Sequence, residues 1–188
     1  MIDPSAYPDS FARDRLPPPE IMPVFEGLEA LGYPKRLNAA VELIDEAVKA
    51  GFGPRLAIRT PAATWTYEEL LDKANRIAAV LKNDLGLLPG NRVLLRSANN
   101  AMKAAAWLGV VKAGGIAVAT MPLLRAQELS YMLGKAKVQF ALCDARLSEE
   151  LQKAESAAPG LKTLFFHTDA ADGLEARMAR QHFGEQQR

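Results

Sequence analysis

Cysteine is nearly absent from this chain of 188 residues, since Cys143 is the only one. A single cysteine cannot form an intramolecular disulfide, which excludes a secreted disulfide scaffold and favours a reducing cytoplasm. Long apolar runs are absent too, because no segment approaches the roughly 20 consecutive apolar residues of a transmembrane helix. The first 20 residues contain acidic side chains and no apolar core segment, so we expect neither a signal peptide nor a membrane anchor.

A charge bias is also missing, because 23 Lys and Arg residues nearly balance 22 Asp and Glu residues. The net charge of +1 gives no reason to expect nucleic acid or a membrane surface as a partner. Hydrophobic residues make up 49% of the chain and charged residues 24%, which is typical of a soluble globular protein. The length is that of one domain, or of a domain with appendages.

The usual catalytic motifs are missing as well. Gly109 and Gly114 have the spacing of a phosphate-binding loop, but Gly115 follows where that loop needs a lysine, so we interpret Gly114 as a helix end. His167 and His182 lie far apart with no cysteine near either of them, so we expect no zinc site. Both histidines are interpreted as surface or interface residues.

Cys143 and Asp144 lie at the end of an apolar segment. We expect Cys143 to be a small core residue rather than a nucleophile, because a buried thiol behaves as a hydrophobe. Asp144 has two interpretations, since α/β proteins bind ligands at the carboxyl ends of strands, while an aspartate there also caps a helix or forms an Asx-turn. The structural interpretation is the simpler one, so the residues by themselves define no active site.

The most informative segment that the chain does contain is 91–122. It predicts a strand at 93–95, a helix at 101–113 that is apolar on nearly every side, a Gly-Gly turn, and a second strand at 116–119. Two buried strands joined by a crossover helix form a parallel pair in an α/β sheet. We therefore predict a mostly parallel sheet with helices on both of its faces.

Further elements follow from periodicity and capping residues. Asn38 is a good N-cap for a helix that ends before Gly51, and Thr66 and Glu69 have the spacing of a capping box. The remaining expected elements are strands at 55–59, around Trp65, at 138–142 and at 161–166, and helices at 66–85, 129–133 (ending at Gly134), 147–157 and 174–183. The recurrence of strands every 22 to 24 residues is the pace of successive βα units.

The first 36 residues differ from the rest because they hold seven of the twelve prolines. We interpret 1–36 as an irregular arm packed on the domain, 37–170 as the α/β unit, and 171–188 as a tail that is in part helical. The arm contains five large apolar residues that need cover, and a disordered tail is the alternative; these residues are Phe11, Leu16, Ile21, Val24 and Phe25.

Three segments in register resemble the AMP-forming acyl- and aryl-CoA ligases. They are TWTYEELLDKANRIAAVL at 64–81, PGNRVLLRSANN at 89–100 and LGVVKAGGIAVATMPLL at 108–124. Two N-terminal segments resemble the benzoate and 2-aminobenzoate branch of that family; these are DSFARDRLPPPE at 9–20 and YPKRLNAAVELID at 33–45. The resemblance covers about 9–170 and corresponds to the opening third of such an enzyme.

This resemblance implies the N-terminal subdomain of an adenylate-forming enzyme's large domain. Such enzymes use ATP and Mg²⁺ to convert a carboxylate, here a small aromatic one, into an acyl-adenylate, and CoA then displaces AMP. The nucleotide motifs are implied to lie downstream, so we expect the 188 residues alone to be inert and to bind none of these cofactors tightly. The implied partners are the rest of the large domain and the C-terminal domain.

The resemblance also places a CoA channel near the loop formed by Thr120, Met121 and Pro122. Some relatives contact CoA through an arginine on the following helix, where this chain has Tyr131, and Arg125 stands where relatives often have a Ser or Thr helix cap. The alternative is a self-contained, doubly wound ligand-binding or interaction domain. If the domain is only part of a larger one, bare apolar surface should promote self-association.

Overall fold

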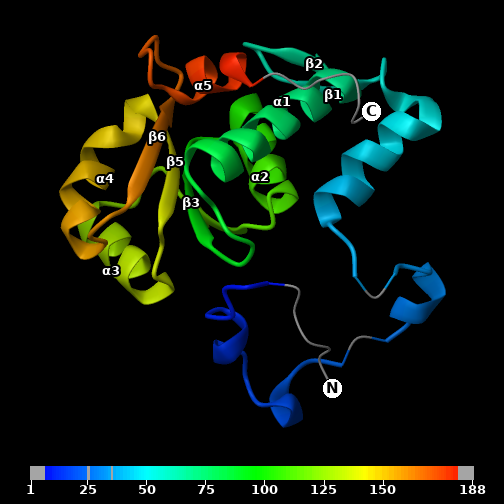
Figure 1. Ribbon diagram of the computed structural model, residues 1–188, viewed down its shortest axis with the longest axis horizontal. Helices are drawn as coiled ribbons and strands as arrows, with labels where there is room; N and C mark the ends of the chain where they lie inside the picture. The colour runs from blue at the N-terminus through cyan, green and yellow to red at the C-terminus, as the bar shows by residue number, and fades with distance from the viewer. Residues whose placement is uncertain (1–6, 25, 35, 182–188) are drawn as a thin grey trace.

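The computed structural model describes residues 7–24, 26–34 and 36–181 (Figure 1). Four parallel strands form its main sheet in the order β4-β3-β5-β6. Their bounds are Arg92–Arg96 for β3, Ile116–Thr120 for β4, Phe140–Asp144 for β5 and Lys162–Phe166 for β6. The predicted α/β class is therefore confirmed.

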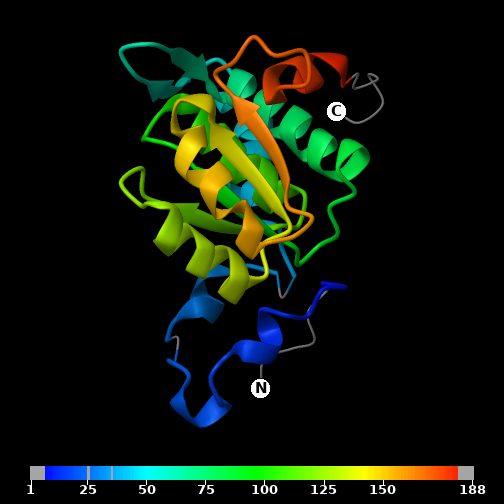
Figure 2. The same cartoon turned by 90° about the vertical axis from the view of Figure 1, so that its left-hand side faces the viewer.

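Helices cover both faces of the sheet. They do so because the side chains of successive strand residues point to opposite faces, and both faces of a parallel sheet are buried. On one face, Val93 and Leu95 of β3 pack with helices α1 (Tyr67–Ala79), α2 (Ala101–Lys112) and α5 (Leu174–Arg180). On the other face, Leu94 packs with α3 (Ala126–Ala136) and α4 (Ser148–Ala154). Figure 2 shows α3 and α4 in front of the strands.

A small antiparallel hairpin precedes α1 and consists of β1 (Leu56–Arg59) and β2 (Thr64–Thr66). The capping box of α1 is confirmed, since the Thr66 hydroxyl accepts a hydrogen bond from Glu69 N and the Glu69 carboxylate accepts one from Thr66 N. A π-helical turn, Val80–Asp84, extends α1. Two 3₁₀ turns, Ala145–Leu147 and Glu155–Ala157, flank α4.

The predicted helix that begins after Asn38 is also present, although most of it is π-helical (Val41–Asp45 and Val48–Phe52). The Asn38 side-chain oxygen accepts from the backbone N–H groups of Ala40 and Val41, and Gly51 leaves helical geometry with a φ of 86°. The Asn38 amide nitrogen donates to the carbonyls of Val111 and Lys112. This helix is thereby attached to the end of α2.

The two glycines with the spacing of a phosphate-binding loop, Gly109 and Gly114, have structural roles. A Cβ on Gly109 would lie 2.6 Å from the Ile77 side chain, so glycine permits the close contact between α1 and α2. Gly114 has a φ of 82° and follows the end of α2, which is the left-handed conformation that favours glycine. The interpretation of Gly114 as a helix end is confirmed.

Two predicted boundaries are wrong. The helix expected to stop at Gly134 continues to Ala136, because Lys137 rather than Gly134 takes the left-handed conformation (φ of 45°) that ends it. The strand expected at 138–142 is β5, Phe140–Asp144, because Val138 N still bonds back to the carbonyl of Leu133. Periodicity detects apolar residues, but it does not distinguish a strand from the end of the turn before it.

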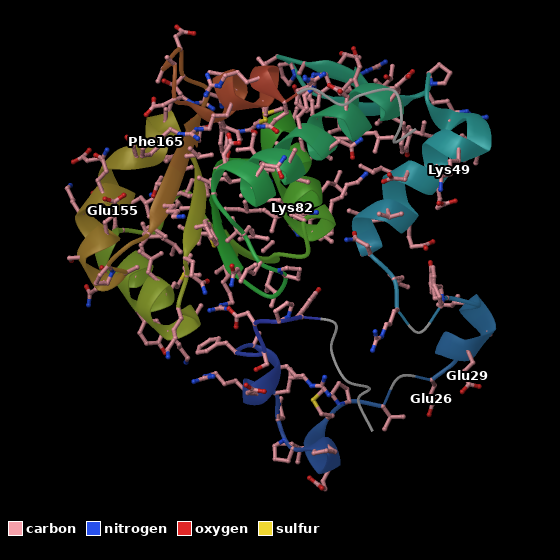
Figure 3. All side chains as sticks on the ribbon, viewed as in Figure 1. Glu26, Glu29, Lys49, Lys82, Glu155 and Phe165 are labelled. Carbon is pink, nitrogen blue, oxygen red and sulfur yellow. The ribbon has the colours of Figure 1, made fainter. Side chains whose placement is uncertain are left out.

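The N-terminal arm contains three 3₁₀ turns, Arg13–Arg15, Pro19–Ile21 and Leu28–Leu31. Ile21 and Val24 are 72% and 86% exposed and Leu16 is also exposed, so the expectation that the domain covers them is wrong. Phe25 lies outside the described residues. Figure 3 shows Glu26 and Glu29 on the outer part of the arm, away from the sheet.

The start of the arm, in contrast, is attached to the amino-terminal edge of the sheet. Asp9 accepts hydrogen bonds from Asn91 (2.8 Å) and Arg92 (2.5 Å), and the Phe11 ring lies 4.6 Å from the Arg92 guanidinium. Burial raises the pKa of Asp9, but hydrogen bonds from Arg92, Phe11 N and Asn91 outweigh this and lower it to about 2. The Asp9 carboxylate is therefore ionised in the folded protein at neutral pH.

The carboxyl-terminal segment is helical only in part. Of the helix expected at 174–183, Leu174–Arg180 is helical, while His182 and the rest of the tail lie outside the described residues. Among residues 7–24, 26–34 and 36–181, no helix is both long and apolar enough to span a bilayer.

We predict that Asp9→Asn releases the arm. The neutral amide loses the ionic bond to Arg92, which we expect to cost roughly 1 to 2 kcal/mol of anchoring. Limited trypsin digestion should then cleave at Arg13 and Arg15 several-fold faster than in the wild type. Glu20→Gln, on the exposed part of the same arm and away from both cleavage sites, is the control, and equal cleavage rates in the two variants would contradict this role of Asp9.

Candidate functional site at the carboxyl edge of the sheet

The carboxyl ends of the four parallel strands meet at one edge of the sheet, where α/β proteins place their ligands. Ser97 follows β3, Met121 follows β4 and His167 follows β6, while Asp144 is the last residue of β5. Two groups of residues form there. One is a polar network centred on Asp144, and the other is the loop 121–124 that follows β4.

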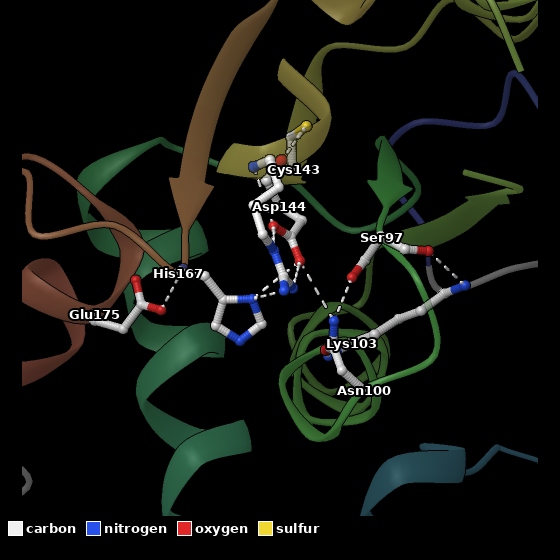
Figure 4. A network of polar contacts seen from close by, with 8 residues as sticks. Ser97, Asn100, Lys103, Cys143, Asp144, His167 and Glu175 are labelled. Atoms are coloured by element: carbon white, nitrogen blue, oxygen red, sulfur yellow. Dashed lines mark hydrogen bonds and ion pairs between the residues drawn. The ribbon is translucent and has the colours of Figure 1, made fainter. Parts of the chain in front are cut away.

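Asp144 is the centre of the polar network (Figure 4) and is 1% exposed. Its carboxylate accepts from the backbone and side chain of Arg146 (3.1 and 2.8 Å) and from the Asn100 amide (3.4 Å), and it lies 2.9 Å from His167 Nδ1. Burial raises the pKa of Asp144, but the hydrogen bonds from Arg146 and His167 outweigh this and lower it to about 2. The Asx-turn expected of Asp144 is confirmed.

His167 and Asn100 join this network from neighbouring elements. His167 has a φ of 56°, and its backbone N–H donates to Glu175 Oε1 at 2.7 Å. Asn100 caps α2 by accepting from Lys103 N (2.9 Å) and donates to Ser97 Oγ (2.7 Å). Sequence reasoning placed His167 at the surface and missed its bond to Asp144, although its position directly after the strand next to β5 could have indicated it.

The network has no metal-binding arrangement and no evident nucleophile. No group of three or more His, Cys, Asp or Glu residues within the described ranges could hold a metal ion. Burial raises the pKa of the Cys143 thiol to about 12, so it stays protonated at neutral pH. The expectation that Cys143 is a core residue is confirmed by its complete burial.

The predicted CoA-channel residues lie on the loop after β4. The Thr120 hydroxyl is buried and donates to the carbonyl of Leu95 at 3.1 Å, so it faces the sheet rather than solvent. Met121 is 60% exposed and Pro122 is half-buried. Of the three residues, Met121 and Pro122 are the ones open to a ligand.

A concave surface of about 340 Å³ lies at the same edge on the α2 side of the sheet and is mostly apolar. Its lining residues come from the end of β3, the first half of α2 and the end of β4; they are Leu95, Asn99, Asn100, Lys103, Ala104, Trp107 and Ala119. Lys103 donates to the carbonyl of Ser97 at 3.2 Å and has no carboxylate partner in the part of the chain that the structure describes. The surface thus combines an indole ring with a cation.

The start of α3 compensates for its unusual cap. Arg125 cannot accept a hydrogen bond from the helix, but Glu128 accepts from Arg125 N (3.0 Å) and Glu150 accepts from Ala126 N (2.9 Å). Tyr131, which stands where some relatives have an arginine, accepts from Lys135 Nζ at 2.7 Å. A positive charge is therefore present one turn further along the helix.

The fold matches part of two solved CoA ligases. An anthranilate CoA ligase solved with anthranoyl-AMP matches with a TM-score of 0.73 at 22% identity, over 81% of this chain and 29% of that one. A benzoate CoA ligase from Burkholderia xenovorans matches with a TM-score of 0.71 at 23% identity, over 80% and 30% of the two chains.

Comparisons of sequence lead to the family. The model of the family described as AMP-binding enzyme matches residues 45–186. Benzoate–CoA ligase of Thauera aromatica is 30% identical over 151 residues, and 4-hydroxybenzoate–CoA/benzoate–CoA ligase of Rhodopseudomonas palustris is 26% identical over 133 residues. These matches cover 80% and 71% of this chain but 29% and 24% of the two relatives. The chain belongs to the AMP-binding enzyme family.

We predict that Asp144 contributes to stability only where it is ionised. Its folded pKa, about 2, is below the ordinary value of 3.8, so its contribution is present above the unfolded pKa and is lost as pH falls toward 2. Asp144→Asn should lower the free energy of unfolding by roughly 2 kcal/mol at pH 6, and the difference from wild type should shrink between pH 4 and 2.

Urea titrations from pH 7 to 2 measure this difference. Asp172→Asn, on an exposed loop near the same edge, is the matched control and should follow the wild type throughout. A constant difference between wild type and Asp144→Asn at every pH would show that the carboxylate's ionisation is not what stabilises the fold.

Proposed function

We propose that this chain forms the N-terminal portion of an ATP-dependent aryl-CoA ligase. In that reaction a carboxylate attacks ATP to give an acyl-adenylate and pyrophosphate, and the CoA thiol then displaces AMP. The observation that carries the proposal is the family match over residues 45–186, in which the motif 108–124 forms the end of α2, β4 and the loop that follows β4. The whole enzyme's activity remains a proposal, since the chain spans 29% of its benzoate–CoA ligase relative.

The residues present do not fit ATP and Mg²⁺. The described residues contain no group of three or more His, Cys, Asp or Glu residues that could hold a metal ion, and Asp144, the buried carboxylate at this edge, is already paired with Arg146. The negative charge on the reacting α-phosphate would also need oriented cations, but Arg146 is committed to Asp144 and Arg96 to backbone carbonyls. We propose that the 188 residues alone are catalytically inert and that the nucleotide binds to the missing portion.

The loop after β4 fits CoA better than the network fits a nucleotide. Met121 is exposed and Pro122 partly so, and Trp107, Lys103 and Ala119 line the concave surface at the same edge. CoA supplies the thiol that takes the acyl group. This chain's own residues would offer apolar contacts to the pantetheine arm and a cation to a phosphate group.

The proposed substrate is a small aromatic carboxylate such as benzoate or 2-aminobenzoate. The names of the relatives support this class, and the acyl pocket itself is proposed to lie in the missing portion. The proposed partners are the rest of the large domain and the C-terminal domain, with 1–36 as the arm, 37–170 as the subdomain and 171–188 as the tail. We propose the cytoplasm as the compartment, because a single buried cysteine suits reducing conditions.

We predict no ATP–pyrophosphate exchange by the purified 188-residue chain with benzoate or 2-aminobenzoate. The reason is that the described residues hold no group suited to a metal ion, and that Arg96 and Arg146 at the carboxyl edge are already bonded to other groups. A complete benzoate–CoA ligase assayed in parallel is the positive control. Exchange above background by this chain would overturn its proposed inertness, and binding of ATP in a calorimetric titration would favour a self-contained ligand-binding domain.

We also predict reversible self-association through the exposed apolar side chains near the carboxyl edge. Met121, Leu123 and Trp107 are exposed there, and apolar surface of this kind promotes association. Met121→Ser with Leu123→Ser should shift sedimentation toward the monomer, whereas Leu88→Ser, an exposed leucine elsewhere, should not. A wild-type chain that sediments as a monomer at high concentration would contradict the prediction.

A further inference from the structure

The amino-terminal edge of the sheet holds a binding site that the arm itself fills. Three side chains of the domain donate hydrogen bonds to the Asp9 carboxylate; they are Asn91 (2.8 Å), Arg92 (2.5 Å) and Gln139 (3.3 Å). The Arg92 guanidinium and the Lys137 ammonium lie 4.6 and 5.3 Å from the centre of the Phe11 ring. The site therefore suits a carboxylate that is followed two residues later by an aromatic ring.

The backbone of this site is shaped for the arm as well. Asp9 N donates to the carbonyl of Pro89 (3.2 Å), and a Cβ on Gly90 would lie 2.2 Å from the carbonyl oxygen of Asp9. Gly90 also has a φ of 92°, so both its conformation and its contact with the arm favour glycine. Arg92 is 4% exposed, and a buried cation of this kind needs a counter-ion. We call this site, formed by residues 89–92, 137 and 139, the anchor site.

The rest of the arm contributes little to its attachment. In the described part of 16–37, no hydrogen bond or ion pair reaches residues 38–181. The arm lies apart from the sheet in both ribbon views (Figure 1 and Figure 2). Several of its large apolar side chains are exposed; they are Leu16, Ile21, Val24, Leu31, Tyr33 and Leu37. Opening the anchor site is therefore enough to detach the segment before Asn38 from the domain.

Both ends of this segment are held at neighbouring points of the domain. The Asn38 amide donates to the carbonyls of Val111 and Lys112 at the end of α2. Gly90 of the anchor site donates its backbone N–H to the carbonyl of Gly114, just beyond α2 (2.8 Å). The chain thus leaves the domain and returns to it at nearly the same place. Loops longer than about 12 to 15 residues without packing of their own are uncommon and are usually functional.

We propose that two copies of this chain exchange their arms, so that Asp9 and Phe11 of each copy occupy the anchor site of the other. Charge complementarity identifies this occupant, because the cations of the site face the Asp9 carboxylate and every copy carries the same segment. Exchange keeps every contact of the anchor site. It also brings the apolar side chains of two arms together, whereas in a single copy they stay in solvent. The inference is independent of the proposed function, since it uses the opposite edge of the sheet from the loop after β4.

Binding of the arm by a separate molecule is tested with a fluorescent peptide of residues 7–16. Fluorescence anisotropy follows its titration into the full chain that carries Asp9→Asn with Phe11→Ser, whose own arm competes poorly for the anchor site. The peptide should bind this variant roughly tenfold more tightly than it binds the wild-type chain, whose site is filled. A peptide with Asp9→Asn is the matched control and should bind roughly tenfold more weakly. Absence of binding by the variant, or equal binding of the two peptides, would overturn the proposal.

Exchange between whole chains is tested with the wild-type protein, so that no variant has to fold. Light chains and chains labelled with nitrogen-15 are mixed in equal amounts, and a zero-length cross-linker joins carboxylates to amines. Mass spectrometry should find links from residues 9–14 to Lys137 that pair a light segment with a heavy one. Their share should rise with protein concentration, because exchange requires two molecules. Links that join only segments of the same isotope at every concentration would contradict exchange of the arms.

The same cross-linking separates arm exchange from association at the carboxyl edge. Met121→Ser with Leu123→Ser should leave the mixed-isotope links unchanged, because these side chains lie at the other edge of the sheet. Phe11→Ser should reduce the mixed links several-fold, since it removes the ring that Arg92 and Lys137 face. Mixed links that disappear in the Met121→Ser with Leu123→Ser variant, and persist in Phe11→Ser, would show contact at the carboxyl edge instead and overturn the exchange.

Discussion

Both ends of the central strand β3 are closed by a buried guanidinium, and the placement of the surrounding segments depends on these two groups. A parallel sheet covered on both faces leaves backbone carbonyls beyond the strand ends without ladder partners or water. At the amino-terminal edge, Arg92 donates hydrogen bonds to the carbonyls of Ala136 and Lys137. At the carboxyl edge, Arg96 donates to the carbonyls of Leu124 and Leu147. The loops at both edges are consequently fixed to the middle of the sheet.

The two edges use this arrangement differently. At the amino-terminal edge the charge of Arg92 is neutralised by Asp9, and the arm becomes attached to the domain. At the carboxyl edge Arg96 has no such counter-ion in the described part of the chain, while Asp144 gathers Asn100 and the side chains that follow the neighbouring strands. The polar groups there are largely satisfied by one another, which fixes their orientation at this edge.

Capping residues and hydrophobic patterns predicted the fold well wherever all the residues involved are close together in the sequence. The capping box of Thr66 and Glu69, the cap formed by Asn38 and the left-handed Gly114 all act within a few residues, so the sequence was enough to place them. The strand–helix–strand segment was equally clear, because an apolar helix between two apolar strands has few alternatives. Errors arose at boundaries such as Lys137, where a residue other than glycine adopts the conformation that ends a helix.

The candidate site was predicted only in part. The resemblance pointed to the loop of Thr120, Met121 and Pro122, but it did not show that the Thr120 hydroxyl faces Leu95. The bond between Asp144 and His167 was missed, because the two residues are far apart in the chain and meet only after β5 and β6 pair. The sequence shows that an acid and a histidine are present, but the distance between Asp144 and His167 depends on the order of the strands in the sheet.

The sequence by itself determined the α/β class, the elements around 91–122 and the family, because hydrophobic period, capping residues and motif spacing are properties of neighbouring residues. Only the tertiary structure decided which carbonyls Arg96 would bind and which apolar side chains would remain in solvent. These depend on the order β4-β3-β5-β6, which brings the ends of four separate segments to one edge. A buried charge must find its partners in three dimensions, and no local pattern specifies them.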